Sequence, residues 1–240
     1  MKLTLFAALI FISLSGCTHI LTLTNNEDKG IKDVLAFYGG YCKYSVGMST
    51  STEDGTKKYF ELEMSKCDVA EKYFTAAPEF PAYGAIYTFY SDLKSESKNY
   101  DEIHGVLIFN NGRKYQYSLS RDTLELIAAK MKVFNEIVNL IKTKDFDGIR
   151  PLLNSDSYTD SAKTQLISNL KTIDSQFGNV KSFLFYGFRI EKYNDYNVLN
   201  ILGGLLRDKQ DSQLSLKIDM RPSEDKIHFL DYNWFLSEKN

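Results

Sequence analysis

The stretch Asp122–Lys142, DTLELIAAKMKVFNEIVNLIK, carries the strongest helical pattern in the chain. Its apolar residues recur every three or four positions, so they would form one stripe along a helix. The members of this stripe are Leu124, Ile127, Met131, Phe134, Val138 and Ile141. A helix of this length can pack against the residues before it and after it. We therefore place a boundary here, between one unit over residues 30–121 and a second over residues 122–240.

Beyond this helix the pattern changes from helices to strands. A short helix is expected near Asp145–Leu153, interrupted by Pro151, and a longer one over Ser161–Phe177, ended by Gly178. Four strand-like runs then cover residues 180–192, 196–206, 213–220 and 226–235. The third run alternates apolar and polar residues, as a half-buried strand does.

Three helices followed by a meander of long strands give the second unit a resemblance to the nuclear-transport-factor-like cone fold. The matching pieces are FNEIVNLIKTKDFDGIRPLL, from Phe134 to Leu153, and IHFLDYNWF, from Ile227 to Phe235. The resemblance rests on the order of the elements rather than on a diagnostic motif. It implies a sheet that, in this family, often encloses a pocket.

The first unit is predicted to alternate hairpins with helices. It opens with a helix over Gly30–Tyr38, and two short helices follow later, one N-capped by Asp68 and one after Pro81. One hairpin turns at Glu53–Thr56 before these short helices, and the other covers Asp101–Ser120 after them. This order predicts a strand-strand-helix-helix-strand-strand unit.

The second hairpin contains Asn111-Gly112, the strongest short signal for a two-residue turn. A two-residue turn would pair Val106 with Tyr117 and Ile108 with Tyr115. The chain as a whole is therefore predicted to be an α+β protein, made of two consecutive small α+β domains with mainly antiparallel sheets.

Cys42 and Cys67 flank the first hairpin and form an even pair once Cys17 is set aside. A two-residue loop at Asp54-Gly55 would place them opposite each other, within disulfide range. The apolar pattern favours a different register with a three-residue loop, in which Gly55 takes the left-handed conformation. Both hold only if the strands bulge or bend, so a Cys42–Cys67 disulfide and two buried thiols remain as alternatives.

The first seventeen residues have the features of an export signal. Lys2 is followed by an apolar run of about ten residues, which is shorter than the roughly 20 needed to span a membrane. Leu14, Ser15 and Gly16 then precede Cys17. This end resembles the lipobox of bacterial lipoproteins, in which the cysteine receives diacylglycerol before the peptidase cuts. The resemblance implies a signal peptide over residues 1–16 and a lipidated Cys17.

The same resemblance implies a location outside the cytoplasm. The family's inner-membrane retention signal is usually Asp after the cysteine, and Thr18 stands there in this chain. We therefore expect the outer membrane, facing the periplasm, in a diderm and the cell surface in a monoderm. Residues 17–29 are expected to be the lipidated N-terminus and a polar tether, whose reach is roughly 40 Å when extended.

Composition excludes some classes of function. Without residues 1–16 the chain keeps 28 Lys and Arg against 31 Asp and Glu, with no basic cluster, so nucleic-acid binding is not expected. The three histidines, His19, His104 and His228, are scattered, and no metal site or cofactor is predicted. No glycine-rich phosphate loop or nucleophile elbow is present, so no catalytic residue is proposed from sequence.

The abundance of aromatic residues, 16 Tyr and 16 Phe, is the one unusual feature of the composition. The run Phe183–Phe188 is apolar on both faces of its strand, which favours core packing, with a ligand cavity or a partner surface as the alternatives. If a pocket forms in the second unit, the polar groups expected to converge in it are Tyr186, Asp219 and Asp231.

The leading hypothesis is a membrane-anchored, non-catalytic binding or envelope-assembly lipoprotein with an envelope protein as partner. The alternative is a small-molecule-binding or enzymatic cone-fold domain on the same tether. A closed apolar cavity with converging polar groups would favour the alternative, and an interior filled by Phe and Leu would count against it.

Overall fold

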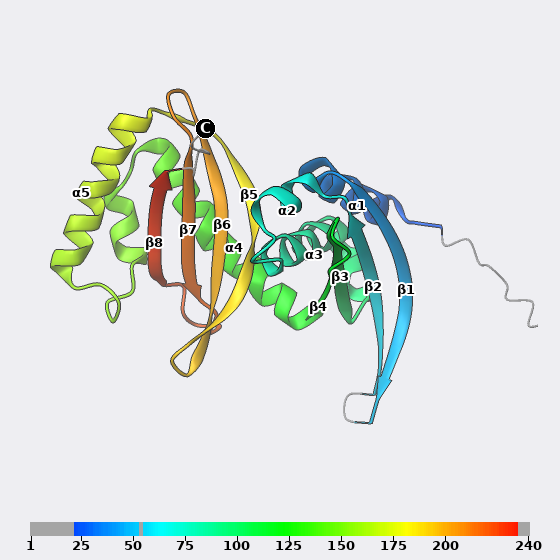
Figure 1. Ribbon diagram of the computed structural model, residues 1–240. Helices are drawn as coiled ribbons and strands as arrows, with labels where there is room; N and C mark the ends of the chain where they lie inside the picture. Colours follow the sequence, from blue (N-terminus) through cyan, green and yellow to red (C-terminus); the bar gives the residue numbers. More distant parts are fainter. Residues whose placement is uncertain (1–21, 53–54, 235–240) are drawn as a thin grey trace, which may run out of the picture.

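The computed structural model describes residues 22–52 and 55–234. Two four-stranded sheets, each with its own helices, stand side by side (Figure 1). The first unit contains α1 (Asn25–Tyr38), β1 (Tyr41–Ser51), β2 (Gly55–Ser65), α2 (Asp68–Tyr73), α3 (Glu79–Leu93), η1 (Lys94–Asn99), β3 (Glu102–Ile108) and β4 (Lys114–Ser120). The second contains α4 (Arg121–Thr143), η2 (Asp147–Leu152), α5 (Asp160–Phe177), β5 (Val180–Tyr193), β6 (Tyr196–Arg207), β7 (Ser212–Asp219) and β8 (Ile227–Trp234). The predicted α+β class with mainly antiparallel sheets is confirmed.

The first sheet has the order β1-β2-β3-β4 and is mixed. Both hairpins are antiparallel, but β2 and β3 run parallel. The reason is the connection: α2, α3 and η1 carry the chain across the sheet and return it in the same direction, as parallel pairing requires. The helices therefore cover one face of this sheet.

The predicted register of the β3–β4 hairpin is wrong by one residue. Leu107, not Ile108, lies opposite Tyr115. The N–H of Phe109 donates to the carbonyl of Arg113, which leaves a three-residue loop whose last residue, Gly112, has φ +83°. A one-residue shift moves every side chain to the other face. Tyr115 therefore lies on the helix-covered face of the sheet.

The β1–β2 hairpin keeps its predicted faces but not the register that would join the cysteines. Val46 lies opposite Phe60, two residues from the register that the apolar pattern favours, and Gly55, which is left-handed with φ +73°, pairs with Ser51. Cys42 lies opposite Met64, whereas Cys67 is beyond the end of β2, at the N-cap of α2. The predicted Cys42–Cys67 disulfide is absent, and both side chains are thiols.

Helix α1 begins five residues earlier than predicted, at Asn25. The cause is a capping box: Thr24 Oγ1 accepts from the N–H of Glu27, and the Glu27 carboxylate accepts from the N–H of Thr24. The predicted tether over residues 17–29 is therefore too long, because its last five residues are helical. Six residues, 18–23, remain between Cys17 and the cap, with a reach of roughly 20 Å.

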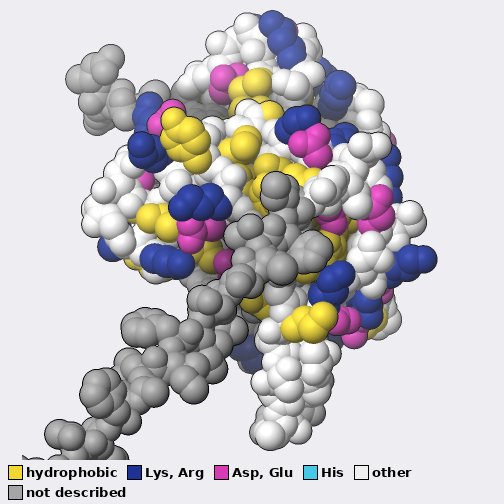
Figure 2. Space-filling model, turned by 90° about the vertical axis from the view of Figure 1, so that its right-hand side faces the viewer, with side chains coloured by type: hydrophobic (Ala, Val, Ile, Leu, Met, Phe, Trp, Pro, Cys, Tyr) yellow, Lys and Arg dark blue, Asp and Glu magenta, His cyan; other side chains and the backbone are white. Residues whose placement is uncertain are grey.

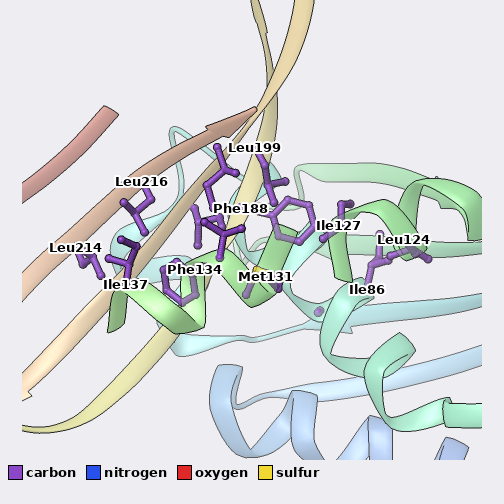
Figure 3. Packing of buried hydrophobic residues seen from close by; sticks show 14 of the residues in the cluster. Ile86, Leu124, Ile127, Met131, Phe134, Ile137, Phe188, Leu199, Leu214 and Leu216 are labelled. Carbon is purple, nitrogen blue, oxygen red and sulfur yellow. The ribbon is translucent and has the colours of Figure 1, made fainter. Parts of the chain in front are cut away.

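Helix α4 serves both units, as its long apolar stripe predicted. Its first half places Leu124 and Ile127 near Ile86 of α3, and its second half places Phe134 and Ile137 against the second sheet (Figure 3). The second sheet is an antiparallel meander, β5-β6-β7-β8. Its four strands match the predicted runs to within one or two residues, although Phe235 lies outside the described residues.

The space between the second sheet and its helices is filled by side chains. The residues that fill it are each no more than 2% exposed and include Phe134, Phe177, Phe188, Leu199, Ile201, Leu205, Leu214 and Leu216. Among the described residues, the interior of the second unit is thus a packed core.

The two units meet where α3 lies against β5. A Cβ atom on Gly84 would lie 2.8 Å from the Cα of Gly187, and one on Gly187 would overlap the carbonyl oxygen of Phe80. Tyr83 stacks on Phe188 at 5.6 Å between ring centres, and Tyr38 OH donates to the carbonyl of Tyr186 over 3.1 Å. Helix and strand can approach this closely only because both contact positions lack a side chain.

We predict that Gly187→Ala destabilises the protein by about 3 kcal/mol, because the added methyl group overlaps backbone and the residue has φ +125°. The control is Gly112→Ala, which also has a positive φ, +83°, but no atom within 4 Å of the added Cβ, and should cost about 1 kcal/mol. Urea unfolding measures both. Equal losses for the two variants would show that the close approach at Gly187 is not what matters.

Candidate functional site

The three residues predicted to converge in a pocket lie at separate places. Tyr186 sits at a bulge in β5, beside the unit junction, with its ring about 6 Å from those of Phe37 and Phe74. Asp219 ends β7, and Asp231 lies on β8 opposite Ser215, four residues along β7 from Asp219. The predicted site therefore does not assemble.

Tyr186 is instead part of the junction between the units. Its backbone carbonyl accepts a hydrogen bond from the Tyr38 hydroxyl. Its half-buried ring packs against Phe37 of α1 and Phe74, the residue after α2. Burial raises the pKa of Tyr186 to about 12, so the phenol stays protonated at neutral pH. This is a packing role.

Asp219 is fully buried and holds a polar network that the sequence did not reveal. Its carboxylate accepts hydrogen bonds from the backbone and guanidinium of Arg221 and lies 3.2 Å from His228 Nε2. The other ring nitrogen, Nδ1, lies 2.7 Å from the hydroxyl oxygen of Ser157. With Nε2 protonated, His228 donates to Asp219 and accepts from Ser157. Tyr196 OH also lies within 3.1 Å of Nε2.

A serine, a histidine and an aspartate in this order match the hydrogen bonds of a nucleophile, a base and an orienting carboxylate. Two observations favour a structural role instead. The N–H of Ser157 donates to the side chain of Asn154, so it does not provide an oxyanion donor. The side chain of His228 is only 2% exposed. The network fastens the loop 153–159 to the ends of β7 and β8.

Other bonds fasten the same loop along β8. The N–H of Asn154 donates to the carbonyl of Ile227 over 2.9 Å, and the N–H of Leu230 donates to Tyr158 OH over 3.0 Å. Leu153 forms an isolated parallel bridge with Ile227. The outer edge of β8 is thus covered by protein.

An open cleft of about 620 Å³ lies between the two units, in the size range of ligand sites. Arg221 lies at its wall, held by Asp219 and stacked at 4.1 Å over the ring of Tyr196. The remaining lining comes from α3, β4, α4, β5 and β6 and the β7–β8 connection, and includes Tyr83, Ser118, Ser120, Thr123 and Asn197. The polar groups are neutral except for Arg221.

Cys42 and Cys67, the two described cysteines, are not reactive thiols. Cys67 is buried, and its Sγ lies 3.6 Å from the carbonyl oxygen of Gly39. Burial is the main cause that raises the pKa of Cys42 to about 12 and that of Cys67 to about 11. Since the thiolate is the reacting form, both react slowly at neutral pH.

Strand β1 presents an open sheet edge with apolar side chains. It is an eleven-residue strand on which Tyr41 is 65%, Tyr44 39% and Met48 72% exposed. Figure 2 looks onto this side of the molecule and shows hydrophobic side chains among charged ones. Lys43 is the only charged residue of β1, no proline interrupts it, and its register with β2 has no shift. Proteins usually protect sheet edges with charged side chains, prolines or bulges, and of these β1 has only Lys43.

The remaining predicted site residues, Leu14, Ser15, Gly16 and Cys17, lie outside the described residues. Within the described ranges, no helix is long and apolar enough to cross a membrane. In the same ranges, no three His, Cys, Asp or Glu side chains gather to hold a metal ion. His104 lies on the outer face of the first sheet, stacked on Tyr59 and 3.0 Å from the carboxylate of Glu102.

Comparison with known proteins returned nothing significant: no family model, no curated protein and no solved structure matches this chain.

We predict that Asp219→Asn lowers stability and weakens its dependence on acid. Burial alone would raise the pKa of Asp219, but the hydrogen bonds from Arg221 and His228 outweigh it and hold the pKa below the ordinary 3.8. Such a group stabilises the fold above its unfolded pKa and loses that contribution as the pH falls through the folded pKa. Breaking a fully buried ion pair costs about 3–5 kcal/mol. Since Arg221 is half-exposed, the loss of stability at pH 7 should be smaller, about 2 kcal/mol.

Urea unfolding between pH 2 and pH 7 measures this effect. The matched control is Asp147→Asn, which removes an exposed ion pair with Lys171 and should cost less than about 0.5 kcal/mol. If wild type and Asp219→Asn lost stability in parallel below pH 4, the carboxylate would not be the acid-sensitive group.

Proposed function

We propose that this protein is a membrane-anchored lipoprotein that works outside the cytoplasm as a non-catalytic binding or assembly protein. The lipid on Cys17 would hold it to the membrane, and the open edge of β1 would bind its protein partner. The observation that carries the proposal is this edge: eleven residues, unprotected, with exposed Tyr and Met side chains. The location we propose is the outer membrane facing the periplasm, or the cell surface.

The treatment of the other sheet edges supports this choice. Strand β8 is covered by the loop 153–159, and β5 lies against α3. Strand β4 has only seven residues. Among the described residues, β1 thus combines a long edge with exposed apolar side chains, and open edges are templates for pairing with another chain.

The short tether supports a partner at the membrane. Only residues 18–23 separate Cys17 from the cap of α1, so the first unit would stay within roughly 20 Å of the lipid. The diacylglycerol that the lipobox resemblance implies would keep the protein on the membrane, because two acyl chains bind far more stably than one. A partner of β1 would then belong to the envelope.

The cleft beside Arg221 supports a second candidate function, the binding of a small molecule. Its volume is adequate, and Arg221 is a fixed cation at its wall. Against an enclosed site stands the packed interior of the second unit. The cleft is open to solvent between the units, so any ligand there would be only partly covered.

The anchor predicts a specific labelling pattern. A clickable fatty acid fed to cells should label the wild-type protein, and Cys17→Ala should lose the label because the acceptor thiol is gone. Cys42→Ala is the control and should keep it. Equal labelling of Cys17→Ala and wild type would refute the lipobox interpretation.

The edge predicts site-specific capture of a protein in the intact envelope. With the photo-crosslinker p-benzoylphenylalanine in place of Tyr44, illumination should give a larger conjugate of defined mass. The same crosslinker in place of Tyr193, similarly exposed but in the second unit, should not. No conjugate from position 44, with the protein correctly lipidated, would remove the edge as a binding site.

A further inference from the structure

The direction of the backbone groups in β1 follows from its neighbours. Lys58 of β2 exchanges hydrogen bonds with Asp101: its carbonyl accepts from the Asp101 N–H, and its own N–H donates to the Asp101 carboxylate. Lys58 thus points its backbone toward β3 and away from Met48, its partner on β1. Because backbone groups alternate along a strand, Cys42, Tyr44, Val46, Met48 and Thr50 all direct their N–H and C=O groups to the open edge.

The same set of residues carries two of the three exposed apolar side chains of β1. Tyr44, Val46 and Met48 lie on the helix-covered face of the sheet, yet Tyr44 and Met48 remain exposed because the helices do not cover β1 fully. Two of the three exposed apolar side chains of β1, those of Tyr44 and Met48, therefore belong to the residues whose backbone groups are available for hydrogen bonding, whereas Tyr41 belongs to the other alternate set. A strand that pairs with this edge would satisfy both at once.

We propose that the occupant of this edge is the β1 strand of a second copy of the chain. This inference rests on the edge binding proposed above and names its partner. In the antiparallel pairing with full overlap, a two-fold axis passes through Val46, Tyr44 of each copy faces Met48 of the other, and Cys42 faces Thr50. These are all residues with outward backbone groups, so the hydrogen-bonding pattern of the two strands matches. The two sheets become one sheet of eight strands.

The charges and side chains of β1 fit this arrangement. Lys43, the only charged residue of β1, faces Ser49 of the other copy, so like charges are not opposed. Tyr44 covers Met48 twice, once on each side of the axis, and sulfur–aromatic contact is favourable. A two-fold pairing uses the same surface on both copies and closes on itself, so it ends the assembly at a dimer.

The register gives a direct test on the lipidated protein in its own membrane. In Val46→Cys, the two introduced thiols meet on the axis, where paired Cα atoms lie about 5.5 Å apart, within disulfide range. Mild oxidation should convert most of the protein to a covalent dimer on a non-reducing gel. Met48→Cys is the matched control: its thiol faces Tyr44, so it should yield at least about tenfold less dimer.

A second pair of variants tests the backbone without adding a thiol. Met48→Pro removes an N–H that faces the open edge, which an edge strand tolerates, and by symmetry deletes two hydrogen bonds from the dimer. Met48→Thr keeps both. With two differently tagged copies in one cell, co-purification should persist in Met48→Thr and fall at least about tenfold in Met48→Pro. Unchanged thermal unfolding of the Met48→Pro variant shows that the unit remains folded.

The outcomes separate the two proposals. A covalent dimer through position 46 but not 48 establishes the second copy as partner. A conjugate of position 44 with a different protein, without dimer at position 46, overturns the second copy and retains the edge as a binding site. Absence of both products overturns the edge itself.

Discussion

The close contact of α3 with β5 is the constraint on which the rest of the molecule depends. Gly84 and Gly187 face each other with no side chains between them, so a helix of the first unit and an edge strand of the second lie in direct backbone contact. Tyr83, Tyr87 and Phe188 pack around this point. The contact fixes how the two sheets are placed, and with them the cleft between the units.

Buried polar groups bind two connections that lie outside the apolar core, the loop 153–159 and the β7–β8 connection. Asp219 binds Arg221 and His228, and through His228 it reaches Ser157. The fully buried Lys130 of α4 donates to the carbonyls of Arg221 and Glu224, which holds the β7–β8 connection against the helix. Each buried charge has partners, as burial requires. Ser157, His228 and Asp219 are hydrogen-bonded in the order of a catalytic triad. Their burial indicates that they stabilise the connection rather than carry out catalysis.

An open sheet edge exposes a protein to aggregation, so its presence in this fold indicates a binding function. Unpaired backbone groups invite association with any strand, and proteins usually blunt such edges with charges, prolines or bulges. In β1 the outward backbone groups and the exposed side chains of Tyr44 and Met48 belong to the same alternate residues. That coincidence suits a specific strand partner, and the short tether would present it at the membrane. The cleft at Arg221 lies on a different part of the molecule and does not compete with it.

The sequence by itself determined the local elements. The stripe of α4, the alternation in β7 and the glycine after α5 depend on neighbours a few residues apart, so periodicity and capping located them to within a residue or two. It missed the cap of α1 at Thr24, although Glu27 three residues later was a readable signal.

Only the tertiary structure decided what distant residues do together. Turn signals left the loop lengths open, and Gly112 in a left-handed conformation set the β3–β4 register. The parallel pairing of β2 with β3, the meeting of Ser157 with His228 and the separation of Tyr186 from Asp219 depend on the path of the chain in space. Local pattern cannot specify such contacts, because their free energy comes from packing between residues far apart in sequence.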